Sequence, residues 1–171
     1  PRARLLRTLG EELISNEVVA VIELVKNAYD ADATRVLIRF NPPIEVHQGS
    51  IEVIDNGHGM SLETVKTAWM EPATISKRRE TRSEKFGRRY LGEKGVGRFA
   101  SARLAEEMEV ITRRVSTERE VFAIFDWRQF DNDDLFLDEV EILWEDRPPT
   151  EIRPGGTIQS LWKSDKSVPR A

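Results

Sequence analysis

The chain has 171 residues, of which 33% are charged and 39% hydrophobic, and its net charge is −4. This balance is typical of one soluble globular domain, and it excludes a disordered chain and a protein that binds nucleic acid over its whole surface. Without cysteine there is no disulfide framework, thiolate nucleophile or cysteine-ligated zinc, and no apolar run is long enough to span a membrane, so we expect a cytoplasmic protein without membrane contact. Because the chain begins at Pro1 rather than Met, we expect residues 1–171 to be one domain of a longer protein.

The pattern that stands out first is a helix over residues 16–33, with Asn16 or the residue before it as the N-cap. At about 100° per residue, Asn27 lies roughly 40° from Glu23 around this helix, and Asp30 lies roughly 20° from Glu23 on the other side. The remaining faces are almost entirely apolar, which predicts a buried helix. Three polar side chains in line on a buried helix predict contact with a bound ligand and its metal, although an internally hydrogen-bonded polar cluster would give the same pattern.

The other elements follow from local periodicity, capping residues and turn residues. Asn41, Pro42 and Pro43 are expected to end the first strand. In chain order we expect a short helix over 2–14, strands over 34–40 and 50–54, a helix over 62–70, a helix over 97–106, and strands over 108–115, 119–127, 134–144 and 157–162. Helices early in the chain and a mostly antiparallel sheet later predict an α+β sandwich.

Residues 71–95 lack a sustained period and are rich in charge. Residues 77–89 hold seven basic side chains against two glutamates, an excess of five positive charges. A structureless segment of this length inside a compact domain is usually functional, so we expect a lid over about 71–98. Its basic run could contact DNA phosphates, although a solvated charged surface is the more common reason for such a run.

Two glycine-bearing loops carry chemical signals. In the first, DNGHGM over 55–60, Asp55 can accept a hydrogen bond from an amino group such as that of adenine, and Gly57 and Gly59 allow a flat ligand to approach the backbone; a tight turn is the alternative. The second, GEKGVG over 92–97, precedes a predicted helix and can bind phosphate through its N–H groups. Its glycine spacing fits neither a Walker A loop nor a Rossmann fingerprint.

Order and spacing are more specific than any single motif. The chain reads E-L-V-x-N-x-x-D-A, then D-N-G-x-G-M after a strand, then G-x-x-G-x-G before a helix, then Gly-Gly-Thr opening the last strand. Over residues 15–162 this resembles the GHKL superfamily of ATPases, which includes gyrase-like topoisomerases, a heat-shock chaperone, histidine kinases and MutL proteins. The motif over 23–33 is most similar to MutL-type and MORC-like members. The resemblance implies a Bergerat-type two-layer sandwich, in which helices cover one face of a mixed, mostly antiparallel sheet.

The resemblance also implies roles for individual residues. Asn27 would ligate Mg²⁺ bound to the ATP phosphates, Glu23 would act as general base on the attacking water, and Asp30 would lie beside the nucleotide. Asp55 would accept from the adenine amino group, and Thr157 would help to bind adenine. The adenine pocket would be shaped by Gly57, Gly59 and Met60, and the phosphate loop would include Gly92, Lys94, Gly95, Val96 and Gly97, with Lys94 either touching phosphate or remaining a solvated charge.

The function implied is Mg²⁺-dependent ATP binding with slow hydrolysis, coupled to lid closure and homodimerisation of a larger clamp-like protein that acts on DNA or on another protein. Phosphoryl transfer to a partner, as in histidine kinases, is one alternative, and a non-catalytic ATP sensor is another. Neither His47 nor His58 resembles a phosphoacceptor on a dimerisation helix, and the Glu23 base favours hydrolysis. Members of the family usually need a basic residue from a following domain, so we expect residues 1–171 alone to be weak or inactive.

Overall fold

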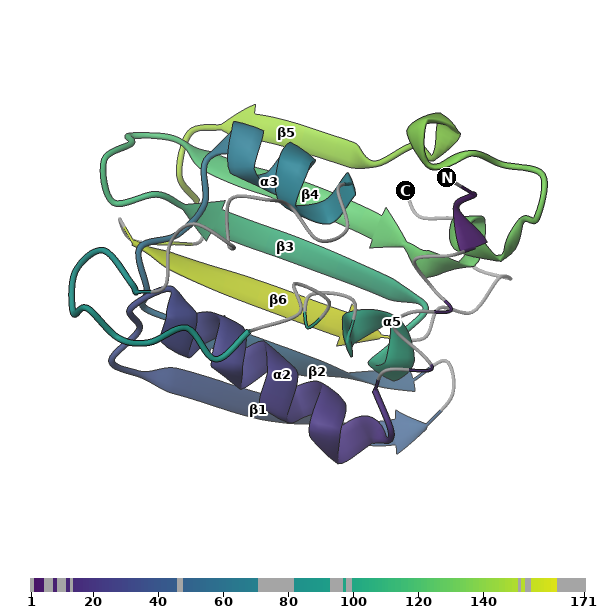
Figure 1. Cartoon of the computed structure of the whole chain (residues 1–171), viewed down its shortest axis with the longest axis horizontal. Helices are drawn as coiled ribbons and strands as arrows, with labels where there is room; N and C mark the ends of the chain where they lie inside the picture. The colour runs from purple at the N-terminus through teal and green to yellow at the C-terminus, as the bar shows by residue number, and fades with distance from the viewer. Residues whose placement is uncertain are drawn as a thin grey trace.

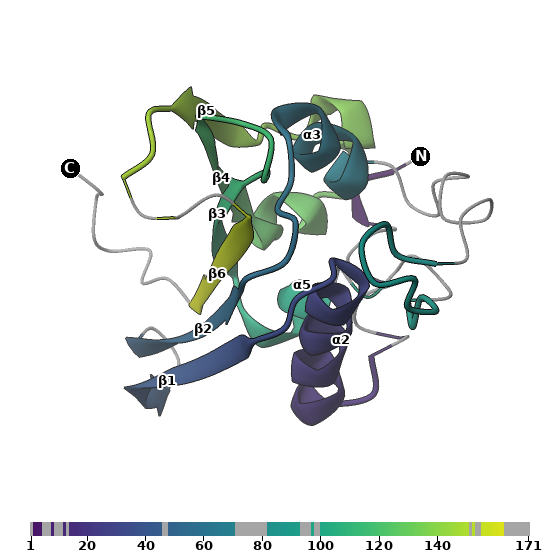
Figure 2. The ribbon, with the colours of Figure 1, turned by 90° about the vertical axis from the view of Figure 1, so that its left-hand side faces the viewer.

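The computed structural model describes residues 2–4, 8, 12, 14–45, 48–70, 82–92, 97, 100–150, 152 and 155–162. These residues form one six-stranded sheet, with helices packed against one of its faces (Figures 1 and 2). The helices are α2 (Glu17–Asp30), α3 (Leu62–Met70) and α5 (Ala100–Leu104); the strands are β1 (Val36–Glu45), β2 (Gln48–Asp55), β3 (Glu107–Arg113), β4 (Glu120–Asp126), β5 (Leu143–Arg147) and β6 (Gly156–Trp162); and two 3₁₀ turns are η2 (Trp127–Asp131) and η3 (Leu137–Glu139).

The sheet has the strand order β1-β2-β6-β3-β4-β5, and each of these five neighbouring pairs is antiparallel. The last strand, β6, therefore lies in the middle of the sheet, between the β1–β2 hairpin and the β3–β4–β5 meander. Residues far apart in the sequence meet along β6. The predicted α+β sandwich is confirmed.

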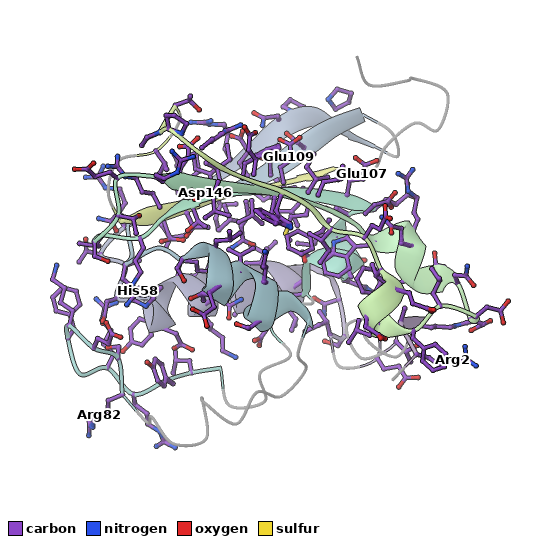
Figure 3. All side chains as sticks on the ribbon, turned by 90° about the horizontal axis from the view of Figure 1, so that it is seen from above. Arg2, His58, Arg82, Glu107, Glu109 and Asp146 are labelled. Carbon is purple, nitrogen blue, oxygen red and sulfur yellow. The ribbon has the colours of Figure 1, made fainter. Side chains whose placement is uncertain are left out.

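The core lies between the sheet and its helical layer. Burial alternates along β3, where Met108, Val110 and Thr112 are buried on the helical side. Glu107 and Glu109 project from the opposite side of the sheet, as the view from above shows (Figure 3). The alternation confirms that one face of this sheet packs against helices.

Helix α2 begins where the sequence predicted, because the Asn16 side chain accepts a hydrogen bond from the Val19 N–H at 3.0 Å. Its inner face buries Ala20, Leu24 and Ala28. The expectation that the helix is buried all round is wrong. Val18 is 69% exposed and Ile22 is 50% exposed, because only one face of α2 packs against the sheet and α5.

Two predicted strand boundaries are also wrong. Strand β1 does not end at its prolines but continues through a cis Pro42–Pro43 bond to Glu45, with a shift of register after Asn41. The strand predicted over 134–144 is mostly the η3 turn and its flanking loops, and β5 occupies only 143–147. Proline is tolerated in an edge strand, where its missing N–H faces away from the sheet, and β1 is such a strand.

Most of the expected N-terminal helix over 2–14 lies outside the described residues, as do parts of the expected lid over 71–98. The predicted helix over 97–106 is shorter than expected, since α5 covers only 100–104. No helix within the described ranges is long and apolar enough to cross a bilayer.

Gly59 and Gly87, two of the four described glycines with positive φ, allow a direct test of packing. An alanine at Gly59, where φ is 66°, would place its Cβ against the carbonyl oxygen of Arg113. We expect Gly59→Ala to lower the free energy of unfolding by more than about 3 kcal/mol, because strain and overlap add. At Gly87, φ is 61° but nothing lies within 4 Å of a built Cβ, so Gly87→Ala should cost only about 1–2 kcal/mol. Urea denaturation of both variants measures the difference, and equal losses would contradict this packing.

Candidate functional site

The polar face of α2 meets the end of the second glycine loop. The Glu23 carboxylate is four-fifths buried, and its Oε1 pairs with the Nζ of Lys26 at 2.7 Å. Gly97 lies against the same face, since a Cβ built there would be 2.7 Å from Glu23 Oε2 and 3.7 Å from Asn27 Oδ1. The structure therefore brings Glu23, Asn27 and Gly97 together, and a side chain at Gly97 would displace the Glu23 carboxylate.

Asp30, the third polar residue of α2, holds the other end of that loop. Its side chain is buried, with Oδ1 accepting from the Leu91 N–H at 2.8 Å and Oδ2 from the Gly92 N–H at 3.0 Å. The segment 92–97 thus starts and ends beside one face of α2, at positions about 10 Å apart along the helix axis. Lys94, Gly95 and Val96 lie outside the described residues.

The first glycine loop, 55–60, is fastened to the same end of α2. The Asn56 Oδ1 accepts from the N–H groups of Thr34 and Arg35, and the His58 N–H donates to the Ala31 carbonyl at 2.8 Å. Gly57 is also tightly placed, because a Cβ there would lie 2.5 Å from the Ala31 oxygen. The tight turn that the sequence allowed as an alternative is present. Its hydrogen bonds to Ala31, Thr34 and Arg35 hold Asp55 beside the C-terminal end of α2.

Asp55 is the residue of this loop whose pKa is shifted. Burial raises its pKa to about 6, although a hydrogen bond from the Gly57 N–H at 2.8 Å and the nearby charge of His58 oppose that rise. The carboxylate is therefore ionised at neutral pH and protonated in mild acid. A half-buried acceptor with a shifted pKa in a glycine-lined loop is a common feature of ligand sites.

Thr112 also lies in line with Asp55 and Thr157, although the sequence analysis did not predict it as a site residue. Asp55 pairs with Thr157 across β2–β6, and Thr157 pairs with Thr112 across β6–β3, so the three residues form one row on the helical side of the sheet. The fully buried Thr112 hydroxyl contacts Thr157 Oγ1 at 2.9 Å, lies 3.1 Å from the Gly156 oxygen, and accepts from the Met60 N–H at 2.9 Å. The alternation of a strand over 108–115 could have placed Thr112 on the buried face, but its partners depend on β6 entering the middle of the sheet.

The donor set fits a magnesium ion that is held mainly by nucleotide phosphates. Mg²⁺ is usually bound by one or two protein oxygens together with phosphates and water. Asn27 offers one amide oxygen next to the glycine loop, and among the described residues there is no cluster of three or more histidine, aspartate or glutamate side chains that could hold a metal by itself. The site thus combines the Asp55 acceptor, the Asn27 amide oxygen, the Glu23 carboxylate and a glycine loop.

Comparison with known proteins places this geometry in context. Residues 14–152 match the family model described as histidine kinase-, DNA gyrase B- and HSP90-like ATPase. That match includes both glycine loops and the polar face of α2, and it ends just before the strand that carries Thr157.

Individual relatives are longer proteins. The chain is 37% identical over 105 residues to a Herpetosiphon aurantiacus protein provisionally assigned as the type II restriction enzyme HgiDII, a match that covers 61% of the chain and 16% of that protein. It is 44% identical over 55 residues to the DNA mismatch repair protein MutL of Crocosphaera subtropica and 38% identical over 66 residues to that of Desulforamulus reducens. The MutL matches cover 32% and 37% of the chain and 9% of each relative, so the chain spans only a small part of these proteins.

The Thr112 hydroxyl can be tested by removing it at nearly constant shape. Thr112→Val leaves the Met60 N–H without its acceptor and the Gly156 carbonyl without this contact, so we expect a loss of about 2–3 kcal/mol in the free energy of unfolding. Thr112→Ser keeps the hydroxyl and should cost no more than about 1.5 kcal/mol, the value of one methyl group in a core. Urea denaturation measures both, and a valine variant as stable as the serine variant would contradict the assigned hydrogen bonds.

Proposed function

The chain belongs to the histidine kinase-, DNA gyrase B- and HSP90-like family of ATPases, and we propose that it binds Mg²⁺–ATP between α2 and the two glycine loops and hydrolyses it slowly. The observation that carries this proposal is the contact of Gly97 with Glu23 and Asn27. It puts the end of a glycine loop on the face of α2 that holds a carboxylate and an amide. A loop of this kind offers N–H groups to phosphate, while the amide offers oxygen to a metal.

The adenine end of the nucleotide would lie in the pocket of Asp55. Its ionised carboxylate would accept from the exocyclic amino group, with Gly57, Gly59 and Met60 as the walls and Thr157 as a further polar contact. The support is chemical: Asp55 is a half-buried acceptor with a raised pKa, and the loop that holds it is rich in glycine. A guanine base presents a carbonyl oxygen at the corresponding position, so an ionised acceptor would reject it.

The phosphate end would lie along α2. Gly92, Gly95 and Gly97 would bind the phosphates, with Lys94 and Val96 in the same loop, and Asn27 would ligate Mg²⁺. The ion, when bound, neutralises phosphate charge and polarises the γ-phosphoryl group. Asp30 would act through the loop rather than by touching the nucleotide, because both of its oxygens accept from loop N–H groups.

Hydrolysis would depend on Glu23. A positioned carboxylate can take a proton from the attacking water and is worth about 10²–10⁴ in rate. Lys26 holds one of its oxygens, which leaves Oε2 directed toward Gly97 and the phosphate loop. A general base in this position favours transfer of the γ-phosphoryl group to water over transfer to a histidine of a partner.

We propose further that the domain belongs to a longer cytoplasmic protein in which ATP binding closes a lid over residues 71–98 and brings two copies together. The relatives named for mismatch repair and restriction favour DNA as the client of that longer protein. A clamp of this kind should bind DNA more tightly with ATP than without it, in a salt-dependent manner. The isolated domain should turn over ATP weakly.

The role of Glu23 is tested with Glu23→Gln in the full-length protein. We expect turnover to fall by about 10²–10⁴ while the ATP dissociation constant changes by no more than about threefold, because the amide keeps the shape but cannot take a proton. Asn27→Ala is the matched variant on the same face, and it should abolish the Mg²⁺ dependence of ATP binding.

Unchanged turnover in Glu23→Gln would show that Glu23 is not the base. Incubation with γ-labelled ATP separates the reactions, since label in inorganic phosphate supports hydrolysis and label retained on protein supports a kinase. Tight ATP binding without either product, in the full-length protein, would instead identify a sensor.

The pKa of Asp55 gives a pH prediction. Its carboxylate is ionised above about pH 6, so adenosine binding should be fully present at pH 7.5 and should be lost as pH falls through 6, by up to about tenfold per unit. Adenosine is the probe because it has no phosphates that titrate in this range. Asp55→Asn should bind adenosine weakly at every pH between 5 and 8, and calorimetric titrations of both proteins measure the contrast. Binding of adenosine to the unmodified protein that does not change with pH would exclude Asp55 as the acceptor.

A further inference from the structure

Helix α2 ends in a turn that normally requires glycine. The Ala33 N–H donates to the Ala28 carbonyl and the Asp32 N–H donates to the Tyr29 carbonyl, which is the hydrogen-bond pattern of a Schellman motif. Asp32 holds the left-handed position of this motif, with φ at 61°. It is the only non-glycine residue with positive φ among the described residues. A side chain at this position costs about 1–2 kcal/mol, so its presence needs a reason in the surrounding contacts.

The carboxylate of Asp32 supplies that reason, because it binds the segment 83–88. Its Oδ2 accepts from the Lys85 N–H at 2.8 Å and its Oδ1 accepts from the Phe86 N–H at 3.3 Å. Although burial tends to raise its pKa, hydrogen bonds from the Ser83 hydroxyl and these two N–H groups outweigh that effect and hold the pKa below its usual value. Asp32 is therefore ionised at neutral pH, and its side chain is buried.

The segment 83–88 is itself a closed turn. The Ser83 N–H donates to the Arg88 carbonyl at 2.8 Å, and the Arg88 N–H donates back to the Ser83 hydroxyl at 2.9 Å. The guanidinium of Arg88 then donates to the Ala33 carbonyl at 2.6 Å and lies 4.7 Å from the centre of the Tyr29 ring. Figure 1 shows this segment in teal beside the C-terminal end of α2. Arg88, one of the seven basic residues of 77–89, thus binds the end of α2 instead of pointing into solvent.

Only three residues, 89–91, separate this turn from the glycine loop 92–97. Leu91 and Gly92 are the residues whose N–H groups bind Asp30, and the loop ends at Gly97 against Glu23 and Asn27. Because this connection is short, a shift of the turn 83–88 would strain the hydrogen bonds that Leu91 and Gly92 donate to Asp30 and would change the direction in which the loop starts. Because phosphate binding depends on the direction of loop N–H groups, such a shift would weaken contacts to phosphate while leaving the Asp55 pocket in place.

We propose that Asp32 is a positioning residue for the nucleotide phosphates: its carboxylate fixes the turn 83–88 on the end of α2, and the turn sets where the glycine loop begins. This inference rests on the proposed nucleotide site and assigns to it a residue that touches no part of the ligand. Asp30 and Asp32 then have separate tasks, since Asp30 holds the loop itself and Asp32 holds the turn that precedes it.

The decisive variant is Asp32→Gly, because glycine keeps the left-handed backbone and removes only the carboxylate. We expect its melting temperature to stay within a few degrees of the parent, since relief of backbone strain offsets the lost hydrogen bonds. Amide exchange at Lys85 and Phe86 should become faster. The dissociation constant for Mg²⁺–ATP should rise about tenfold while that for adenosine stays unchanged, because only contacts to phosphate depend on the loop.

Two further variants serve as controls. Asp32→Asn tolerates the same backbone and keeps one acceptor oxygen, so it should restore part of the ATP affinity that Asp32→Gly loses. Ser83→Ala removes a hydroxyl that binds the Asp32 carboxylate from the turn itself, and it should weaken ATP more than adenosine without touching the helix end. Ser83→Ala also provides the comparison if Asp32→Gly fails to fold.

The outcomes separate this inference from the proposed function. If the parent protein binds ATP and adenosine, and Asp32→Gly binds ATP equally well despite faster exchange at Lys85 and Phe86, Asp32 has only a structural role. An equal loss of ATP and adenosine affinity would also exclude a role specific to the phosphates. If the parent protein binds neither ligand, the nucleotide site itself is wrong, and the positioning role falls with it.

Discussion

The C-terminal turn of α2 is the constraint on which the rest of the site depends. Within residues 30–33, two carboxylates and two backbone carbonyls accept from segments that lie far away in the sequence. His58 of the first glycine loop donates to Ala31, the turn 83–88 donates to Asp32, and the start of the second glycine loop donates to Asp30. The last carbonyl groups of a helix normally have no partner within the helix. Here the carbonyls of Ala31 and Ala33 accept hydrogen bonds from the first glycine loop and from the turn 83–88.

This arrangement fixes the described parts of the loops to the end of α2. Loops gain stability when their backbone groups find partners in a packed element, and α2 is such an element because its inner face buries Leu24 and Ala28. The sheet then fixes the far side of the first loop, where Gly59 packs against Arg113 and Met60 binds Thr112. The protein groups that would contact a ligand can therefore be in position before the ligand binds, which lowers the entropic cost of binding.

Much of this could be predicted from the sequence, because local patterns fix local structure. The cap at Asn16, the polar face of α2, the Asp55 turn and the α+β class all follow from spacing and residue type. The exposed outer face of α2 was missed, because an apolar composition on all sides of a helix does not reveal which face meets the sheet. Long-range pairing was also beyond reach: Thr112 lies beside Thr157 only because β6 enters between β2 and β3, and Asp32 shows its role only once residues 53 positions later fold back onto it.

The central claim is that the polar face of α2 and the two glycine loops form one site for Mg²⁺–ATP. A crystal structure of the protein with Mg²⁺ and a non-hydrolysable ATP analogue tests it most directly. The account predicts the adenine amino group within hydrogen-bond distance of the Asp55 carboxylate, and Mg²⁺ about 2.1 Å from Asn27 Oδ1 with its other ligands from phosphate and water. A nucleotide bound elsewhere, or one whose phosphates point away from α2, would contradict the account.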